Sequence, residues 1–214
     1  RLNLAKIGFE LLDWRQRERE GRGAARGSRL LVDCTALLWH QTASLLSLEQ
    51  ALGVPVHAII YERTVILLHP LRAYMEHAGA GNRYTIGVEI VCRAAGIEGD
   101  PRTVWRSKRE IARGASAESL VREATAGQLA AGRLLGAYYV HETARQGGEI
   151  VSSEYHRNTS SSRVTDPGSR IALGIGLPVA RAHGLEHGSP VVGSGKPTPT
   201  VWGGASGVRF NWRV

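Results

Sequence analysis

Residues 30–40 (LLVDCTALLWH) form a largely apolar run that ends in a polar residue. A run of this kind is typical of a strand buried on both faces, as in a sheet covered by helices. Further strands are expected where β-branched and other apolar residues gather, at residues 54–61, 65–68, 84–92 and 149–155. The stretch 30–40 therefore predicts a strand inside a sheet.

Helical patterns lie before and between these strands. Residues 117–145 carry the clearest one, with Ser116 as the N-cap residue and a Gly-Gly pair at 147–148 beyond its end. A short helix is expected over residues 44–52, and residues 2–20 predict an amphipathic helix. This order of strands and helices indicates an α/β fold, a sheet covered by helices. The apolar positions of the two longer patterns are Leu4, Ile7, Leu11 and Trp14, and Leu120, Ala124, Ala131, Leu134 and Tyr138.

The composition bounds the class of protein. A chain of 214 residues is long enough to bury a large core, and its apolar fraction of 43% excludes wholesale disorder. No apolar run is long enough to cross a membrane, and the charged first 20 residues do not resemble a secretory signal. Cys34 and Cys92 are too few for a disulfide framework or an all-cysteine zinc site, so buried free thiols are expected.

The chain is strongly basic, with a net charge of +8 that comes almost entirely from arginine. A positive field attracts polyanions, which include nucleic acid, anionic cell-wall polymers and acidic membrane surfaces. Because no basic surface interleaved with aromatic residues is visible in the sequence, a nucleic-acid partner is disfavoured.

A few polar residues stand where chemistry is possible. His40 ends a buried strand, His156 follows another, and Asp166 comes ten residues later. Two imidazoles and one carboxylate can hold zinc and leave a fourth position for water. Glu89 interrupts an apolar strand, where a charge is costly unless it is paired or functional, so it is the candidate general base. The spacing alone is also compatible with His40, His156 and Asp166 being three unrelated polar residues. His57 is expected to be a packed histidine of the sheet.

Short segments stand in a fixed order between residues 29 and 175. They are WHQTA at 39–43, HAII at 57–60, EHAG at 76–79 followed by Asn82 and TIGVE at 85–89, YHR at 155–157, and DPG at 166–168. In this order and at these separations they resemble the motifs of the zinc-dependent N-acetylmuramoyl-L-alanine amidases, the amidase type 2 and peptidoglycan recognition protein family.

The resemblance implies a central mixed β-sheet flanked by helices, with Zn²⁺ at one end of it. It implies that zinc-activated water hydrolyses the amide between the muramic acid lactyl group and L-alanine of peptidoglycan. Zinc would also stabilise the oxyanion that forms. The residues expected at this site are the zinc ligands His40, His156 and Asp166, the general base Glu89, and the substrate-binding residues His77, Asn82, Arg157 and Arg163.

The chain departs from the family pattern at Val164, where many active members carry a lysine two residues before the zinc aspartate. Arg157 and Arg163 are nearby cations, although arginine does not simply replace lysine. The departure keeps open a second interpretation, a non-catalytic peptidoglycan-binding recognition module. The retained ligands and Glu89 favour the enzyme.

Residues 29–187 are expected to form the amidase-like domain, between an N-terminal amphipathic helix and linker at 1–28 and a Gly- and Pro-rich extension at 188–214. The resemblance implies an antimicrobial hydrolase that acts on the bacterial cell wall. It would be a phage endolysin released from the cytoplasm by a holin, or a periplasmic or extracellular bacterial enzyme.

Overall fold

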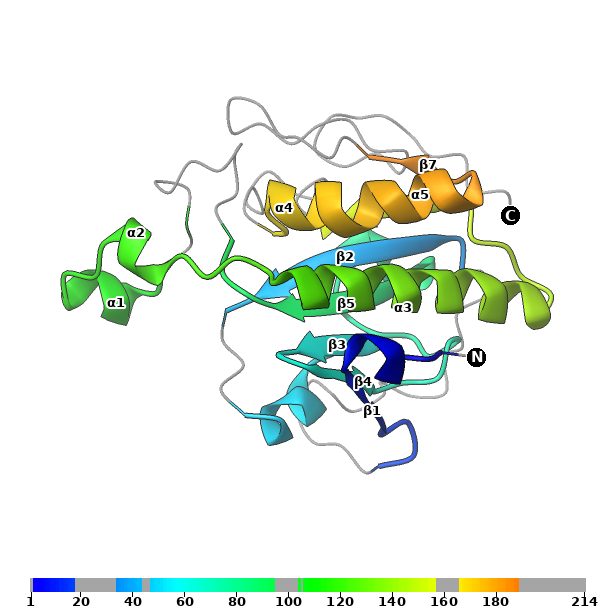
Figure 1. Ribbon diagram of the computed structural model, residues 1–214, viewed down its shortest axis with the longest axis horizontal. Helices are drawn as coiled ribbons and strands as arrows, with labels where there is room; N and C mark the ends of the chain where they lie inside the picture. The colour runs from blue at the N-terminus through cyan, green and yellow to red at the C-terminus, as the bar shows by residue number, and fades with distance from the viewer. Residues whose placement is uncertain are drawn as a thin grey trace.

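The computed structural model describes residues 2–17, 34–43, 47–94, 104, 106–156 and 166–188. These residues form one mixed sheet in the strand order β1-β4-β3-β5-β2-β6-β7 (Figure 1). Neighbouring strands are parallel except β3 and β4, which form an antiparallel hairpin. The strands are β1 (Glu10–Asp13), β2 (Ala36–Thr42), β3 (Ala58–Tyr61), β4 (Thr64–Leu67), β5 (Thr85–Val91), β6 (Ser152–Tyr155) and β7 (Glu186–His187). The expected α/β fold and mixed sheet are confirmed.

Helices cover the sheet. The long helix α3 (Ala126–Arg145) lies beside a second helical run, formed by α4 (Ser169–Ile171), the π-helical turn η7 (Ala172–Gly176) and α5 (Leu177–His183) (Figure 1). None of the described helices is long and apolar enough to span a membrane. The other helical segments are η1 (Ala5–Ile7), η3 (Glu49–Gly53), η4 (Gly79–Arg83), α1 (Lys108–Ala112) and α2 (Ala117–Leu120).

The two faces of the sheet bury different clusters, because successive side chains of a strand point to opposite sides. Leu37 and Trp39 of β2 are fully buried and belong to the larger core, which includes residues of α3. Ile59 and Ile66 belong to a smaller cluster on the other side. His40, the residue after Trp39, therefore faces away from the larger core.

The π-helical turn connects the second helical run to α3 and β6. Pro178 has no N–H to donate to the carbonyl of Gly174 four residues earlier, and its ring crowds that carbonyl. Arg133 of α3 donates to the Gly174 carbonyl instead, at 2.7 Å. The hydroxyl of Tyr155 in β6 donates to the Ala172 carbonyl at 3.3 Å. The widened turn thus fixes the position of β6 immediately before His156.

The N-terminal segment differs from the helix expected over residues 2–20. Within the described residues 2–17, only Ala5–Ile7 form a helical turn, and Glu10–Asp13 form the edge strand β1, parallel to β4; residues 18–20 lie outside the description. Leu4 and Phe9 are buried in the larger core. The helix prediction was wrong because pairing with β4 and contacts with the core outweigh local helical periodicity.

The helix expected over 117–145 is interrupted. Ser116 caps α2 as predicted, but α3 starts at a second cap, Thr125, whose hydroxyl accepts the N–H of Gln128. Between the two helices, Arg122 exchanges backbone hydrogen bonds of 2.7 and 2.9 Å with Arg93. This bridge holds the chain in an extended conformation that a continuous helix would not allow.

Other sequence-based expectations need smaller corrections. The buried face of α3 is rotated from the predicted stripe, since Ala131 is buried but Leu134 is 37% exposed. Within the described part of residues 44–52, only the short η3 forms, and residues 44–46 lie outside the description. Cys34 and Cys92 are buried free thiols, as predicted.

His57 fastens β5 to the chain that follows β4. Its Nδ1 accepts the backbone N–H of Gly87 at 3.1 Å, and its Nε2 donates to the carbonyl of Ala73 at 3.0 Å. The side chain is fully buried, which confirms the expected packed histidine. Burial lowers the pKa of His57 from 6.5 to about 4.

The hydrogen bond from Tyr155 to the π-helical turn has a measurable effect on stability. We expect Tyr155→Phe to lower the free energy of unfolding by about 1 kcal/mol, because the buried hydrogen bond between the Tyr155 hydroxyl and the Ala172 carbonyl is lost, while that carbonyl keeps the N–H of Leu177. Urea denaturation measures this change. Tyr139→Phe is the control, since it removes the same hydroxyl from another buried tyrosine of the same core and leaves the hydrogen bond between Tyr155 and Ala172 intact. Equal losses in both variants would contradict the assigned role.

The low pKa of His57 makes stability depend on pH. Between pH 6.5 and about pH 4 the unfolded chain binds a proton that the folded chain does not. The free energy of unfolding is therefore expected to fall by about 3 kcal/mol as the pH is lowered through this window. Asparagine keeps an acceptor for the Gly87 N–H but does not titrate. Urea denaturation of His57→Asn should show a shallower pH dependence than the unmodified chain, and an equal slope would refute the assignment.

Candidate metal centre

Three parallel strands bring polar side chains together where they end. The register of β2 and β5 pairs His40 with Glu89. The pairing of β2 with β6 reaches Trp39 and Tyr155, so His156, the next residue, stands beside His40. Since paired positions of parallel strands present their side chains on the same face, the register gathers the three groups at one point.

The distances between these side chains are short. Nδ1 of His40 lies 2.9 Å from Nδ1 of His156, which lies 2.8 Å from Oδ2 of Asp166. Oε2 of Glu89 lies 3.9 Å from Nδ1 of His40. His40 is only 2% exposed and His156 9%, so the cluster is shielded on most sides.

Asp166 is held in place by the strand that carries His40. Its Oδ1 accepts the backbone N–H of Gln41 at 2.8 Å. The side-chain oxygen of Gln41 accepts the N–H of Gly168 at 2.9 Å. One residue of β2 thus fixes both ends of the 166–168 segment and leaves Oδ2 of Asp166 directed at the histidines.

The donor set fits a metal ion. One ligand atom each from His40, His156 and Asp166 lies within 4.8 Å of the others. Two imidazole nitrogens and one carboxylate oxygen are the ligands of catalytic zinc sites, which keep a fourth position for water or substrate. Two facing ring nitrogens with a carboxylate beside them also form an environment that stabilises a cation.

His77 lies against the far side of His40. Its Nδ1 is 2.9 Å from Nε2 of His40, and its Nε2 is 3.2 Å from the hydroxyl of Thr85. Burial, together with the nearby imidazoles of His57 and His156, holds the pKa of His77 well below its usual range. His77 is therefore a neutral imidazole near neutral pH.

Asn82 and Gly87 set the position of His77. The side-chain oxygen of Asn82 accepts the N–H groups of His77 and Ala78, at 2.9 and 2.5 Å. A Cβ atom at Gly87 would lie 2.6 Å from Nδ1 of His77, so only glycine leaves room for the ring over β5. Asn82 is 6% exposed and acts on the loop. Contact of His77 or Asn82 with substrate stays a prediction.

The two arginines expected to bind substrate, Arg157 and Arg163, lie outside the described residues, as does Val164. The sequence did not single out Gln41 or Thr85, which hold Asp166 and His77. Both belong to the quoted motifs, so membership of a motif was the signal available in the sequence.

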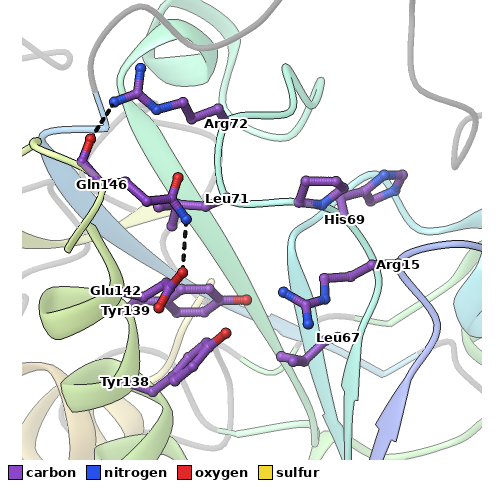
Figure 2. A pocket seen from close by; sticks show the side chains of 10 residues that line it. Arg15, Leu67, His69, Leu71, Arg72, Tyr138, Tyr139, Glu142 and Gln146 are labelled. Carbon is purple, nitrogen blue, oxygen red and sulfur yellow. Dashed lines mark hydrogen bonds between the residues drawn. The ribbon is translucent and has the colours of Figure 1, made fainter. Parts of the chain in front are cut away.

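A separate pocket lies where β4 ends, at the opposite end of the sheet from the carboxyl ends of β2 and β6. Figure 2 shows its walls, with Arg15 and His69 on one side and Tyr138 and Tyr139 of α3 on the other. Its volume is about 150 Å³. Because β4 runs antiparallel to β3, its carboxyl end lies beside the amino end of β3, which runs parallel to β5. The pocket is therefore remote from the carboxyl ends of β2 and β6, where His40 and His156 meet. None of the predicted site residues lines it.

Comparisons with known proteins bear on the fold. No family model matches the sequence, and no curated protein matches it. Among solved structures, the chain is similar to the N-acetylmuramoyl-L-alanine amidase LysC from Clostridium intestinale URNW, with 11% sequence identity and a TM-score of 0.50 over 83% of this chain and 99% of that chain. It is also similar to the endolysin N-acetylmuramoyl-L-alanine amidase LysCS from the same organism, with 11% identity and a TM-score of 0.48 over 83% and 97%. The architecture is therefore the α/β fold found in LysC.

Proposed function

We propose that the protein is a zinc-dependent N-acetylmuramoyl-L-alanine amidase. It would hydrolyse the amide between the lactyl group of muramic acid and L-alanine in peptidoglycan. The observation that carries the proposal is the convergence of His40, His156 and Asp166 next to Glu89. The fold supports it, because the clostridial protein LysC, which has this fold, is an N-acetylmuramoyl-L-alanine amidase.

Such a reaction needs metal ligands and a general base, and the chain has candidates for both. His40, His156 and Asp166 would hold the metal, and a zinc ion there supplies an acidified water and polarises the scissile carbonyl. Glu89 accepts the proton of the attacking water and returns it to the amine of L-alanine as the amide breaks. Its carboxylate suits this role because it lies 3.9 Å from His40 and its side chain is 13% exposed.

The charge of the chain suits a substrate in the bacterial cell wall. A net charge of +8 attracts anionic wall polymers and raises the rate of encounter with them. LysC, the similar clostridial structure, is an N-acetylmuramoyl-L-alanine amidase. We place the action of this protein at the cell wall, as an endolysin-type hydrolase.

Glu89→Gln tests the general base. The substitution keeps the size of the side chain and removes its basicity, so we expect the release of stem peptides from purified peptidoglycan to fall by about 10²–10⁴-fold. Zinc content, measured by elemental analysis, should not change. Glu118→Gln on the exposed surface of α2 is the matched control and should keep full activity. Undiminished cleavage by Glu89→Gln would rule out this role.

Removal of the metal tests zinc dependence. The purified chain should contain about one zinc ion, as a single three-ligand site predicts. A chelator should abolish cleavage and added zinc should restore it. Asp166→Asn should lower the zinc content, because a neutral amide is a poorer ligand than a carboxylate. Cleavage without zinc would contradict the mechanism. Zinc binding and retention on peptidoglycan without cleavage would identify a recognition module instead.

A further inference from the structure

We propose that His77 is a positioning residue that fixes the tautomer and the ring orientation of His40. The inference rests on the proposed function, since it concerns the same metal centre. It assigns to His77 a role in the protein's own hydrogen bonding, where the sequence suggested contact with substrate. The four groups that carry it, His40, His77, Thr85 and the Gly81 carbonyl, are called the relay below.

The relay is a continuous line of hydrogen bonds. Nε2 of His40 lies 2.9 Å from Nδ1 of His77. Nε2 of His77 lies 3.2 Å from Oγ1 of Thr85, and this hydroxyl donates to the carbonyl of Gly81 at 2.9 Å. Thr85 is fully buried, so water does not compete for its hydroxyl.

The carbonyl of Gly81, the last group of the relay, sets the direction of each hydrogen bond. A backbone carbonyl only accepts, so the one hydroxyl hydrogen of Thr85 is used on Gly81. The oxygen of Thr85 then accepts from His77, which requires a hydrogen on Nε2 of His77. A neutral imidazole with its hydrogen on Nε2 has an acceptor at Nδ1. Nδ1 of His77 therefore accepts a hydrogen from Nε2 of His40.

This direction leaves the other nitrogen of His40 as a lone pair. Nδ1 of His40 faces Nδ1 of His156 at 2.9 Å and Oε2 of Glu89 at 3.9 Å, which is where a metal would be bound. Ligating histidines commonly donate their second ring N–H to a partner that fixes the tautomer. Here the partner is the imidazole of His77. The carbonyl of Gly81, two hydrogen bonds further along the relay, makes Nδ1 of His77 an acceptor.

The surroundings of His77 hold its ring in the required place. Asn82 binds its backbone N–H at 2.9 Å, and Gly87 provides the space beneath the ring. The ring of His77 meets that of His40 edge-on, with centroids 5.1 Å apart and planes at 67°. A ring that contacts His40 and Thr85 and lies over Gly87 is suited to orienting a ligand.

Nuclear magnetic resonance tests the direction of the relay without any substrate. Long-range ¹H–¹⁵N correlation of the ¹⁵N-histidine-labelled full chain, before and after zinc is added, distinguishes the two neutral tautomers of each ring. We expect His40 and His77 both to carry their hydrogen on Nε2 in both states. A hydrogen on Nδ1 of His40 in the metal-free protein, or on Nδ1 of His77 in either state, would overturn the proposal.

The zinc affinity of variants tests whether the relay strengthens metal binding. Loss of such a partner typically weakens metal binding by about 10–100-fold, so we expect Thr85→Val and His77→Leu to raise the zinc dissociation constant within that range. His77→Asn keeps an acceptor near the place of Nδ1 and should recover part of the affinity. Thr143→Val is the matched control, because it is the same buried substitution on α3 and no described residue bonds to the Thr143 hydroxyl.

The outcomes separate this inference from the proposed function. An unchanged zinc affinity in Thr85→Val, with or without a change in KM for peptidoglycan in His77→Asn, would refute the relay. A weakened affinity in a protein that never cleaves peptidoglycan would support the relay while refuting the amidase.

Discussion

The parallel pairing of β5, β2 and β6 is the constraint on which the site depends. Neighbouring strands lie about 4.8 Å apart, so paired residues come within reach of a single ion. A slip of one residue in β2 would turn His40 into the apolar core and Trp39 toward the candidate metal site. The larger core prevents this slip, because Trp39 is fully buried and its indole N–H donates to Ser153 of β6 at 2.8 Å. Apolar packing on one face of the sheet thus fixes the positions of the polar side chains on the other face.

The polar face would be costly if its groups lacked partners, since an unpaired buried polar group costs about 1–3 kcal/mol or more. Two lines of hydrogen bonds solve this problem, and each ends on a backbone carbonyl. His57 ends on Ala73, and the line through His77 ends on Gly81. The turn that supplies the Gly81 carbonyl therefore supports the candidate metal site, although none of its residues is a candidate ligand. The Ala73 carbonyl instead holds His57, which binds the backbone of β5.

The sequence predicted the sheet, the main helix and the converging residues because these features are local or belong to ordered motifs. His40 and His156 could be placed together because one ends an expected strand, the other follows one, and both stand in motifs of the family that the sequence resembles. The strand at 10–13 could not be predicted, because its periodicity also fits a helix and only the open edge of β4 decides between the two. The proposed relay depends on the directions of single side chains, those of His40 in β2, His77 in the chain before β5 and Thr85 at the start of β5, which residue patterns do not encode.

The short strand β1 has a consequence for how the protein can be handled. It covers the backbone groups of β4, while Arg63 donates to the carbonyl of Gly8 at 3.1 Å and ties the N-terminal turn to the hairpin. An uncovered strand edge is a template for pairing between chains. β1 is itself an edge strand, but it carries the charged residues Glu10 and Asp13, whereas β4 carries Val65, Ile66 and Leu67. A shortened protein that lacks residues 2–13 would present this apolar strand as its edge and would be more prone to aggregate through it.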